Sequence, residues 1–147
     1  MSDGEDVPFL SGSEIGVTVA VVVVAAVIED SHRFLVTRRP AGVHLAGMWE
    51  FPGGKIDPDE THEAALRREL LEELGVKAAV GECIYRTRHA YPDRTIALYF
   101  YRCSLDSAPR PLLGQEMRWV PLAELRSLEF PPSDTELIEL LTTAGAR

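Results

Sequence analysis

Apolar runs separated by short polar turns dominate the first third of the chain. Residues 15–28 form a nearly unbroken valine-rich run, which is typical of a central strand with both faces covered. A second strand is predicted at residues 33–38, and a short third one at residues 49–51. This third strand ends at Pro52 and two glycines, which interrupt a regular strand.

The next segment changes to helical spacing. Leucines recur there every four residues, so they share one face of a predicted helix over residues 61–74. Thr61 or Asp59 is expected to cap its N-terminus, and Gly75 to supply the left-handed residue that ends it. The leucines of the buried face are Leu66, Leu70 and Leu74.

Strands return after this helix, and a second helix closes the chain. The predicted strands are residues 76–86, 95–105 and 117–120, with a turn over residues 89–94. The last helix is expected to start near Ser133, where Ser133 and Glu136 fit a capping box. Strands combined with two helices in this way predict a mixed sheet between helical layers.

Length and charge limit the classes of function. The chain has 147 residues, enough for one domain with a substantial core, predicted at residues 14–147 after a polar lead-in at residues 1–13. The net charge of −8 disfavours general affinity for nucleic acid or an anionic membrane. A monomer or a homodimer is expected.

Residues 15–28 are too few to span a bilayer, which needs about 20 apolar residues. The flank before this run is acidic, unlike that of a signal peptide. A cytoplasmic protein is therefore expected. Cys83 and Cys103 lack a CxxC partner and are expected to be buried free thiols.

Three carboxylates on the first predicted helix suggest chemistry. Glu69, Glu72 and Glu73 lie at relative positions 0, +3 and +4, which places them on one helix face. Like charges this close repel one another, and a solvated acidic face is the ordinary alternative. A divalent cation such as Mg²⁺ makes the arrangement favourable, because it prefers carboxylate oxygens. We therefore predict a metal site on this helix.

The same stretch resembles a known motif. Gly54, Glu60 and the run from Arg68 to Val76 read G-x5-E-x7-R-E-U-x-E-E-x-G-U, with U apolar. Every position matches the Nudix box. The resemblance implies an α/β/α sandwich with a mixed central sheet. It also implies hydrolysis of a nucleoside diphosphate linked to another group, with Mg²⁺ as cofactor and Mn²⁺ as an acceptable substitute.

The resemblance also assigns roles within the box. Glu69 and Glu73 are expected to ligate Mg²⁺ directly, Glu72 directly or through water, and the carbonyl of Gly53 adds an oxygen. Arg68 is expected to orient a catalytic glutamate.

Two further roles follow for residues near the start of the box. Glu60 is expected to hold the loop to the helix. Lys55 either contacts phosphate or only compensates the acidic charge nearby.

The general base is less well defined by the motif. MutT-like members of the family often carry a glutamate followed by Gly-Gln in a late loop, and Leu113 occupies that position here. Glu116 lies close by and is a candidate substitute. If Glu116 does not act, Glu69 or Glu72 must take the proton.

Segments outside the box resemble MutT-like 8-oxo-dGTP diphosphatases. They are Thr37–Pro40, Leu45–Phe51, Tyr91–Arg94 and Phe130–Asp134. By this resemblance Arg39 contacts phosphate or base, and Arg94 helps to close the pocket. The residues expected to line the pocket are His44, Glu50 and Phe51.

Asp134 is the candidate base reader. The bacterial MutT pattern often has an asparagine there, which both donates and accepts, whereas an ionised aspartate only accepts. An acceptor suits guanine N1–H and N2–H₂, 8-oxoguanine N7–H, or the amino group of cytosine. The alternative is that Asp134 only stabilises the N-terminus of the last helix, through its interaction with the helix dipole.

These observations predict a Mg²⁺-dependent pyrophosphohydrolase that converts 8-oxo-dGTP to the monophosphate and pyrophosphate. The closest alternative is the same reaction on CTP, dCTP or 5-methyl-dCTP. Alternatives of other classes are a nucleotide sensor without turnover and an acidic protein-interaction domain.

Overall fold

The structure is a computed structural model that describes residues 20–40, 42 and 47–145. The predicted lead-in at residues 1–13, the first part of the predicted first strand and His44 lie outside these residues.

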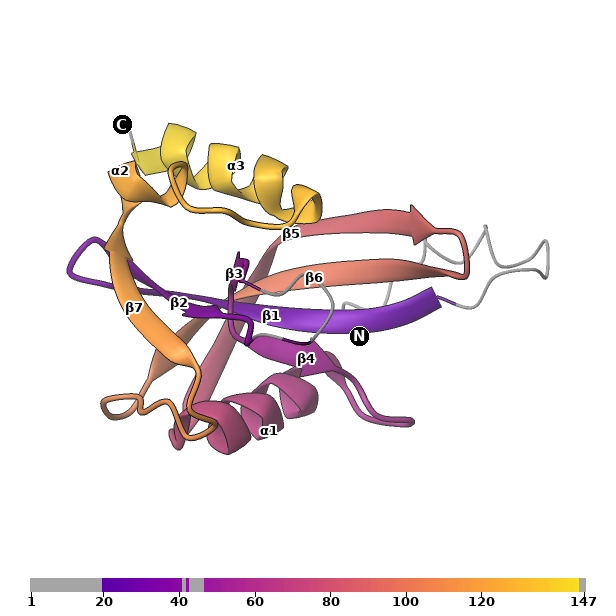
Figure 1. The fold of residues 1–147 in the computed structure, drawn as a ribbon. Helices are drawn as coiled ribbons and strands as arrows, with labels where there is room; N and C mark the ends of the chain where they lie inside the picture. Colours follow the sequence, from indigo (N-terminus) through magenta and orange to yellow (C-terminus); the bar gives the residue numbers. More distant parts are fainter. Residues whose placement is uncertain (1–19, 41, 43–46, 146–147) are drawn as a thin grey trace.

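A seven-stranded mixed sheet forms the centre of the molecule (Figure 1). Its main path runs β3-β2-β1-β6-β5, while β4 pairs with β1 and β7 pairs with β2. The β1–β6 pair is parallel and the others are antiparallel. The strands are β1 (Ala20–Asp30), β2 (Arg33–Arg38), β3 (Trp49–Glu50), β4 (Gly53–Lys55), β5 (Ala78–Tyr91), β6 (Arg94–Leu105) and β7 (Glu116–Pro121).

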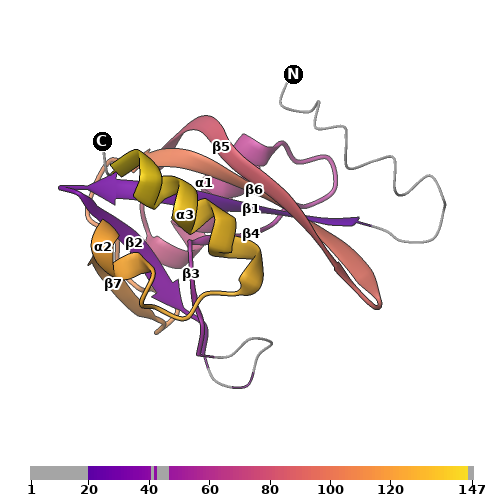
Figure 2. The same ribbon diagram turned by 90° about the horizontal axis from the view of Figure 1, so that it is seen from above.

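Helices cover the two faces of this sheet, which confirms the predicted α/β/α arrangement (Figure 1). One face carries α1 (His62–Leu74), and the other carries α2 (Leu122–Leu125) and α3 (Thr135–Gly145). A short 3₁₀ turn, η2 (Pro132–Asp134), leads into α3. In Figure 2, α3 crosses over the sheet, with α1 on the far side.

Each helix buries an apolar face against the sheet. On the α1 side, Leu66, Leu70 and Leu74 are fully buried and pack with Tyr99 and Tyr101 of β6. On the other side, the buried residues of α3 pack with Val27, Phe100 and Trp49; they are Leu137, Ile138 and Leu141. The two clusters fix where α1 and α3 stand relative to the strands between them.

The local signals of α1 are confirmed. The Thr61 side chain accepts a hydrogen bond from the Ala64 N–H, so Thr61 is the cap and Asp59 is not. Gly75 ends the helix in the left-handed region, at φ 68°. The helix that carries the three glutamates is thus held at both ends by the residues that flank it.

Three predictions from the sequence were wrong. The turn at residues 89–94 is much shorter, because β5 continues to Tyr91 and β6 already starts at Arg94. No capping box forms at α3, since the Ser133 hydroxyl donates to Asp134 and the Glu136 carboxylate accepts from Tyr85. Cys83 is exposed, because irregular pairing of β5 on both sides of it disrupts the inward alternation.

Cys103 is buried as expected, and both cysteines are free thiols. In the part of the chain that the structure describes, no helix combines the length and apolar character needed to cross a membrane.

Candidate active site

The site begins where the backbone of β4 meets α1. Gly53 and Gly54 pair with Ala25 and Val24 of β1. A Cβ on Gly54 would lie 2.5 Å from Cδ and from one carboxylate oxygen of Glu69. The Glu69 carboxylate therefore lies directly on the β4 backbone, and only glycine at position 54 leaves room for it.

Arg68 holds this carboxylate from the other side. Its Nη1 donates to Glu69 Oε2 at 2.9 Å, and its Nη2 donates to the Lys55 carbonyl at 3.1 Å. A bidentate pair with Glu60 completes the contacts, with N–O distances of 2.8 and 2.9 Å. Arg68 thus joins β4, the loop before α1 and α1 itself. The predicted contacts of Arg68 with Glu69 and of Glu60 between loop and helix are present.

Glu60 is well suited to remain ionised. The hydrogen bond from Arg68, followed by that from the Asp57 N–H, lowers the pKa of Glu60 to about 2. A permanent carboxylate at Glu60 keeps the Arg68 guanidinium in place.

Burial and the neighbouring carboxylates disfavour the charged form of Glu73. Burial raises the pKa of Glu73, and a hydrogen bond with Glu69 and the charges of Glu69, Glu50 and Glu72 raise it further. A divalent cation removes this penalty, because it attracts the ionised oxygens that otherwise repel one another. The donor set, carboxylates beside the Gly53 backbone, therefore fits a hard metal ion such as Mg²⁺.

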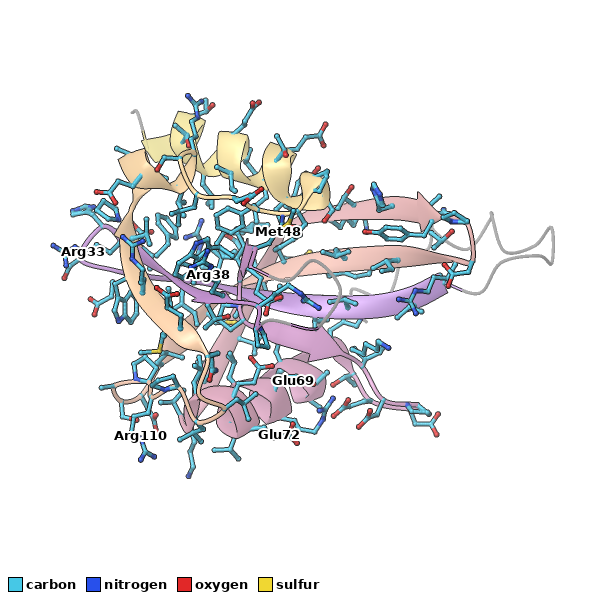
Figure 3. The ribbon with its side chains drawn as sticks, viewed as in Figure 1. Arg33, Arg38, Met48, Glu69, Glu72 and Arg110 are labelled. Atoms are coloured by element: carbon cyan, nitrogen blue, oxygen red, sulfur yellow. The ribbon has the colours of Figure 1, made fainter. Side chains whose placement is uncertain are left out.

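Glu72 and Glu69 lie in different surroundings on α1. Glu72 has a side chain that is 59% exposed, and its Oε1 lies 3.6 Å from Arg68 Nη1. Figure 3 labels Glu69 and Glu72 on α1, and Glu69 is the one that contacts β4. No ready-made cluster of three His, Cys, Asp or Glu ligands occurs within residues 20–40, 42 and 47–145.

A cleft of about 480 Å³ extends from this corner across the sheet. Gly53, Gly54, Lys55 and Glu73 line one part of it. Phe51, Phe100 and Asp134 are among the residues that line the remainder. Of the sequence-predicted residues, those that line the cleft are Arg39, Glu50, Phe51, Gly53, Lys55, Glu73, Arg94 and Asp134.

Glu69, Glu72, Arg68 and Glu116 do not line this cleft. Glu69 and Arg68 lie just behind it, through their contacts with Gly54 and Lys55. A second depression, of about 570 Å³, is formed by β1, β5 and β6 and contains none of the predicted site residues.

Arg39 and Glu50 form an ion pair in the cleft wall, with 2.7 Å between Nη1 and Oε1. Both side chains are about one-third exposed, at 30% and 36%. Burial raises the pKa of Glu50 even though Arg39 opposes the shift. The pair therefore brings a cation and a hydrogen-bond acceptor to the same stretch of the cleft.

Asp134 is the most buried polar group of the cleft, at 4% exposure. Its Oδ1 accepts a hydrogen bond from the Ser133 hydroxyl at 3.1 Å. Burial raises the pKa of Asp134 to about 7, and the charge of Glu50 adds to this effect. Near neutral pH the side chain is thus partly protonated, and the protonated form both donates and accepts, as an asparagine does.

Glu116 is not brought to the cleft. It lies at the start of β7, where its Oε1 is 3.3 Å from Arg38 Nη1. The exposed Leu113 lies in a loop held against the end of α1, because the Leu112 N–H and Gln115 Nε2 both donate to the Glu73 carbonyl, at 3.0 and 3.2 Å.

Several residues of the cleft were not predicted from the sequence, among them Phe100 and Ser133. Two others, His89 and Tyr91, are aromatic, and their ring centroids are 4.6 Å apart. They were assigned to a turn, although their positions two residues apart are also those of one face of a strand. Recognising the longer hairpin would have placed them beside Arg94.

Carboxylates and a glycine backbone beside a cleft that also contains Lys55, Arg39 and Arg94 are typical of one class of protein, the metal-dependent hydrolases of phosphoric anhydrides. A family model for the NUDIX domain matches residues 23–140. The chain therefore belongs to the Nudix family, whose hydrolases generally require a divalent metal.

Curated relatives support this membership. The chain is 37% identical over 118 residues to a CTP pyrophosphohydrolase of Escherichia coli strain K12, covering 80% of this chain and 87% of the relative. It is 34% identical over 121 residues to an 8-oxo-dGTP diphosphatase of the same strain, covering 82% and 94%. These relatives support a pyrophosphohydrolase activity.

Solved structures agree in fold. The E. coli ORF135 protein superposes with a TM-score of 0.79 at 35% identity, covering 90% of this chain and 96% of that one. The MutT protein of Methanosarcina mazei Go1 gives 0.77 at 22% identity, covering 88% and 98%.

Proposed function

We propose that this Nudix pyrophosphohydrolase hydrolyses 8-oxo-dGTP to 8-oxo-dGMP and pyrophosphate, with Mg²⁺ as its metal, in the cytoplasm. The observation that carries the proposal is Asp134, a buried polar side chain in the same cleft as Lys55 and Glu73. Ser133 satisfies one of its oxygens, and a ligand in the cleft would supply the further hydrogen bonds that a buried carboxyl group needs. The relative named 8-oxo-dGTP diphosphatase supports the choice of base. The substrate is a free nucleotide, not a nucleic acid.

Glu69, Glu73 and the Gly53 carbonyl would hold Mg²⁺, or Mn²⁺ in its place, with Glu72 as a further ligand. A bound ion of this kind neutralises phosphate charge and lowers the pKa of a coordinated water. The chain supplies the remaining cations, since Lys55, Arg39 and Arg94 all line the cleft.

The proton of the attacking water needs an acceptor. We assign this role to Glu69, because its carboxylate lies against Gly54, a residue that lines the cleft, and because Arg68 fixes its orientation. Glu72 is the alternative, and Glu116 is less well supported because it pairs with Arg38 outside the cleft. Water oxygen forms a new bond to phosphorus, the bridging P–O bond breaks, and pyrophosphate leaves with the bonding electron pair.

Base recognition is assigned to Asp134, with Phe51, Glu50 and Arg39 beside it. The protonated carboxyl donates to a carbonyl and accepts from an N–H, as recognition of 8-oxoguanine requires. The ionised form would instead accept from the amino group of a cytosine. That form, and the relative named CTP pyrophosphohydrolase, favour cytosine nucleotides as the second candidate substrates.

The test is pyrophosphate release from 8-oxo-dGTP, dGTP, CTP, dCTP and 5-methyl-dCTP, with Mg²⁺ and with EDTA. We expect the highest kcat/KM for 8-oxo-dGTP and no turnover in EDTA. A higher kcat/KM for a cytosine nucleotide would replace the proposed substrate by the second candidate. Binding of these nucleotides without turnover of any would identify a sensor instead.

The metal assignment is tested by Glu73→Gln. We expect it to lower kcat by at least about 100-fold, with an unchanged circular dichroism spectrum. Glu63→Gln is the matched control, because Glu63 lies on the same helix and pairs with Arg67 at the surface. Full turnover by the Glu73→Gln variant would exclude Glu73 as a ligand.

A further inference from the structure

A hydrogen bond connects the edge of the sheet to the first turn of α3. The Tyr85 hydroxyl of β5 donates to Oε1 of Glu136. Glu136 comes only two residues after Asp134, and Figure 1 shows this end of α3 beside β5. The Tyr85 ring also packs against Phe100, which lines the cleft, with ring centroids 6.0 Å apart. The hydrogen bond therefore connects Tyr85, which packs against a residue of the cleft wall, to the segment that carries Asp134.

The segment that carries Asp134 is held to the sheet by the buried Leu137 and Ile138 of α3 and by a set of contacts nearer to the aspartate. No side chain caps the η2 turn, and within the turn the Asp134 N–H donates to the Pro131 carbonyl at 2.9 Å. Upstream, the segment is held where the Trp49 N–H donates to the Glu129 carbonyl at 2.8 Å. Phe130 then stacks on Phe51 at a centroid distance of 5.4 Å. Downstream, the nearest side-chain hydrogen bond to the sheet that the described residues form is the one between Tyr85 and Glu136.

We propose that Tyr85 and Glu136 form a positioning pair that sets where the Asp134 carboxyl lies in the cleft, and so determines how strictly the enzyme discriminates among nucleobases. Neither residue lines the cleft, so the pair acts through the η2 turn and not by touching the nucleotide. The inference rests on the proposed role of Asp134 as base reader.

The chemistry of the pair suits this role. Burial raises the pKa of Tyr85, and its bond to Glu136 raises it further, so the hydroxyl stays a donor at physiological pH. Hydrogen bonds to a charged acceptor are the stronger kind. Discrimination by a hydrogen-bonding side chain depends on its placement, since a displaced group leaves buried polar atoms unpaired.

The test compares Tyr85→Phe and Glu136→Ala with Glu136→Gln. The first two remove the bond, whereas glutamine keeps an acceptor oxygen and should rescue it. The readout is Kd for 8-oxo-dGMP, dGMP and dCMP by titration calorimetry, which needs no turnover. We expect Tyr85→Phe and Glu136→Ala to reduce the preference for the favoured monophosphate about tenfold. In turnover of the matching triphosphate, KM should rise while kcat changes less than about twofold.

Two controls separate positioning from general loss of stability. Glu139→Ala removes an exposed carboxylate from the same helix. Tyr101→Phe removes a hydroxyl that lies 2.7 Å from His62 Nδ1, on the opposite face of the sheet. Both should keep the wild-type preference, even if Tyr101→Phe lowers Tm as much as Tyr85→Phe does.

Two results would overturn the positioning pair. One is an unchanged preference in Tyr85→Phe and Glu136→Ala together with a lower Tm, which would make the bond a structural tie only. The other is a wild type that binds all three monophosphates equally. A preference for dCMP would refute 8-oxo-dGTP as substrate. The positioning pair would then still be tested by whether its variants lose the preference for dCMP.

Discussion

Two adjacent glycines of β4 meet very different neighbours. A Cβ on Gly53 would lie 2.0 Å from the Val24 carbonyl oxygen, which belongs to the sheet backbone. The three atoms nearest to a Cβ on Gly54 would all belong to the end of the Glu69 side chain. Backbone cannot yield without disturbing the strand pairing, whereas a carboxylate can rotate away. A substitution at Gly53 should therefore affect mainly stability, and a substitution at Gly54 mainly catalysis.

We expect Gly53→Ala to destabilise the protein by about 3 kcal/mol or more, because the clash falls on backbone. Gly54→Ala should unfold at nearly the wild-type urea concentration but lose about 100-fold in kcat, since Glu69 is displaced. Urea unfolding and steady-state kinetics of the two variants check this. Similar activity and stability in both would show that the close approach has no functional effect.

Asp134 gives a prediction for the pH dependence of stability. Its pKa is about 7 in the folded chain, raised by burial above the ordinary value of 3.8. The folded state thus binds more protons than the unfolded state between these values, and stability falls as pH rises through them. At about 1.4 kcal/mol per pKa unit, the loss is on the order of a few kcal/mol above about pH 7.

Asp134→Asn should remove that slope, because an amide does not titrate. We expect Tm of the variant, measured relative to wild type by thermal denaturation, to increase from pH 4 to pH 8 as the wild type loses stability. A constant difference in Tm over this range would mean that Asp134 is ionised in the folded protein throughout.

Some residues of the site can be predicted from the sequence more easily than others. The glutamates of α1 stand out because their spacing is unfavourable without a metal, and that conflict is visible in the sequence itself. The protonation of Asp134 depends on burial by residues distant in sequence. His89 and Tyr91 line the cleft because β5 continues to Tyr91, past its predicted end at residue 86, and pairs there with the start of β6.

Among the elements, α1 is predicted almost to the residue. Its cap, its leucine stripe and its terminal glycine are local signals that operate within the helix. The last helix shows the opposite case. Ser133 and Glu136 have capping-box spacing, yet Tyr85 of a remote strand is the partner of Glu136. A prediction from local spacing fails where a tertiary contact engages the same side chain.

Strand ends likewise depend on tertiary pairing. Tyr91 faces Arg94 across a turn of only two residues, Pro92 and Asp93, so the β5–β6 hairpin is longer than its apolar pattern indicates. The outer part of this hairpin carries polar residues, which is why the sequence suggests a turn there. The short helix α2 had no periodic signal long enough to be predicted.

For the molecule as a whole, the net charge of −8 and the carboxylates near Glu73 make the metal-free fold less stable than it would be with a cation bound. An ion that binds only the folded state, present at about 100 times its Kd, adds about 2.7 kcal/mol. We expect Mg²⁺ to raise Tm by several degrees in a saturable manner, measured by differential scanning fluorimetry.

Sodium chloride at matched ionic strength is the control for general screening, and Glu73→Gln should lose the Mg²⁺-specific part of the shift. Equal shifts from both salts would argue against a discrete metal site.

The parallel pairing of β1 with β6 has a consequence for synthesis on the ribosome. Ala20 of β1 pairs with Thr95, about 75 residues further along the chain. At roughly 5–20 residues per second, that partner emerges about 4–15 s after β1. During this interval the valine-rich strand, which is fully buried in the finished protein from Val24 to Ile28, has no parallel neighbour. The nascent chain is therefore an expected client of chaperones that bind extended apolar segments, until the second half of the domain is made.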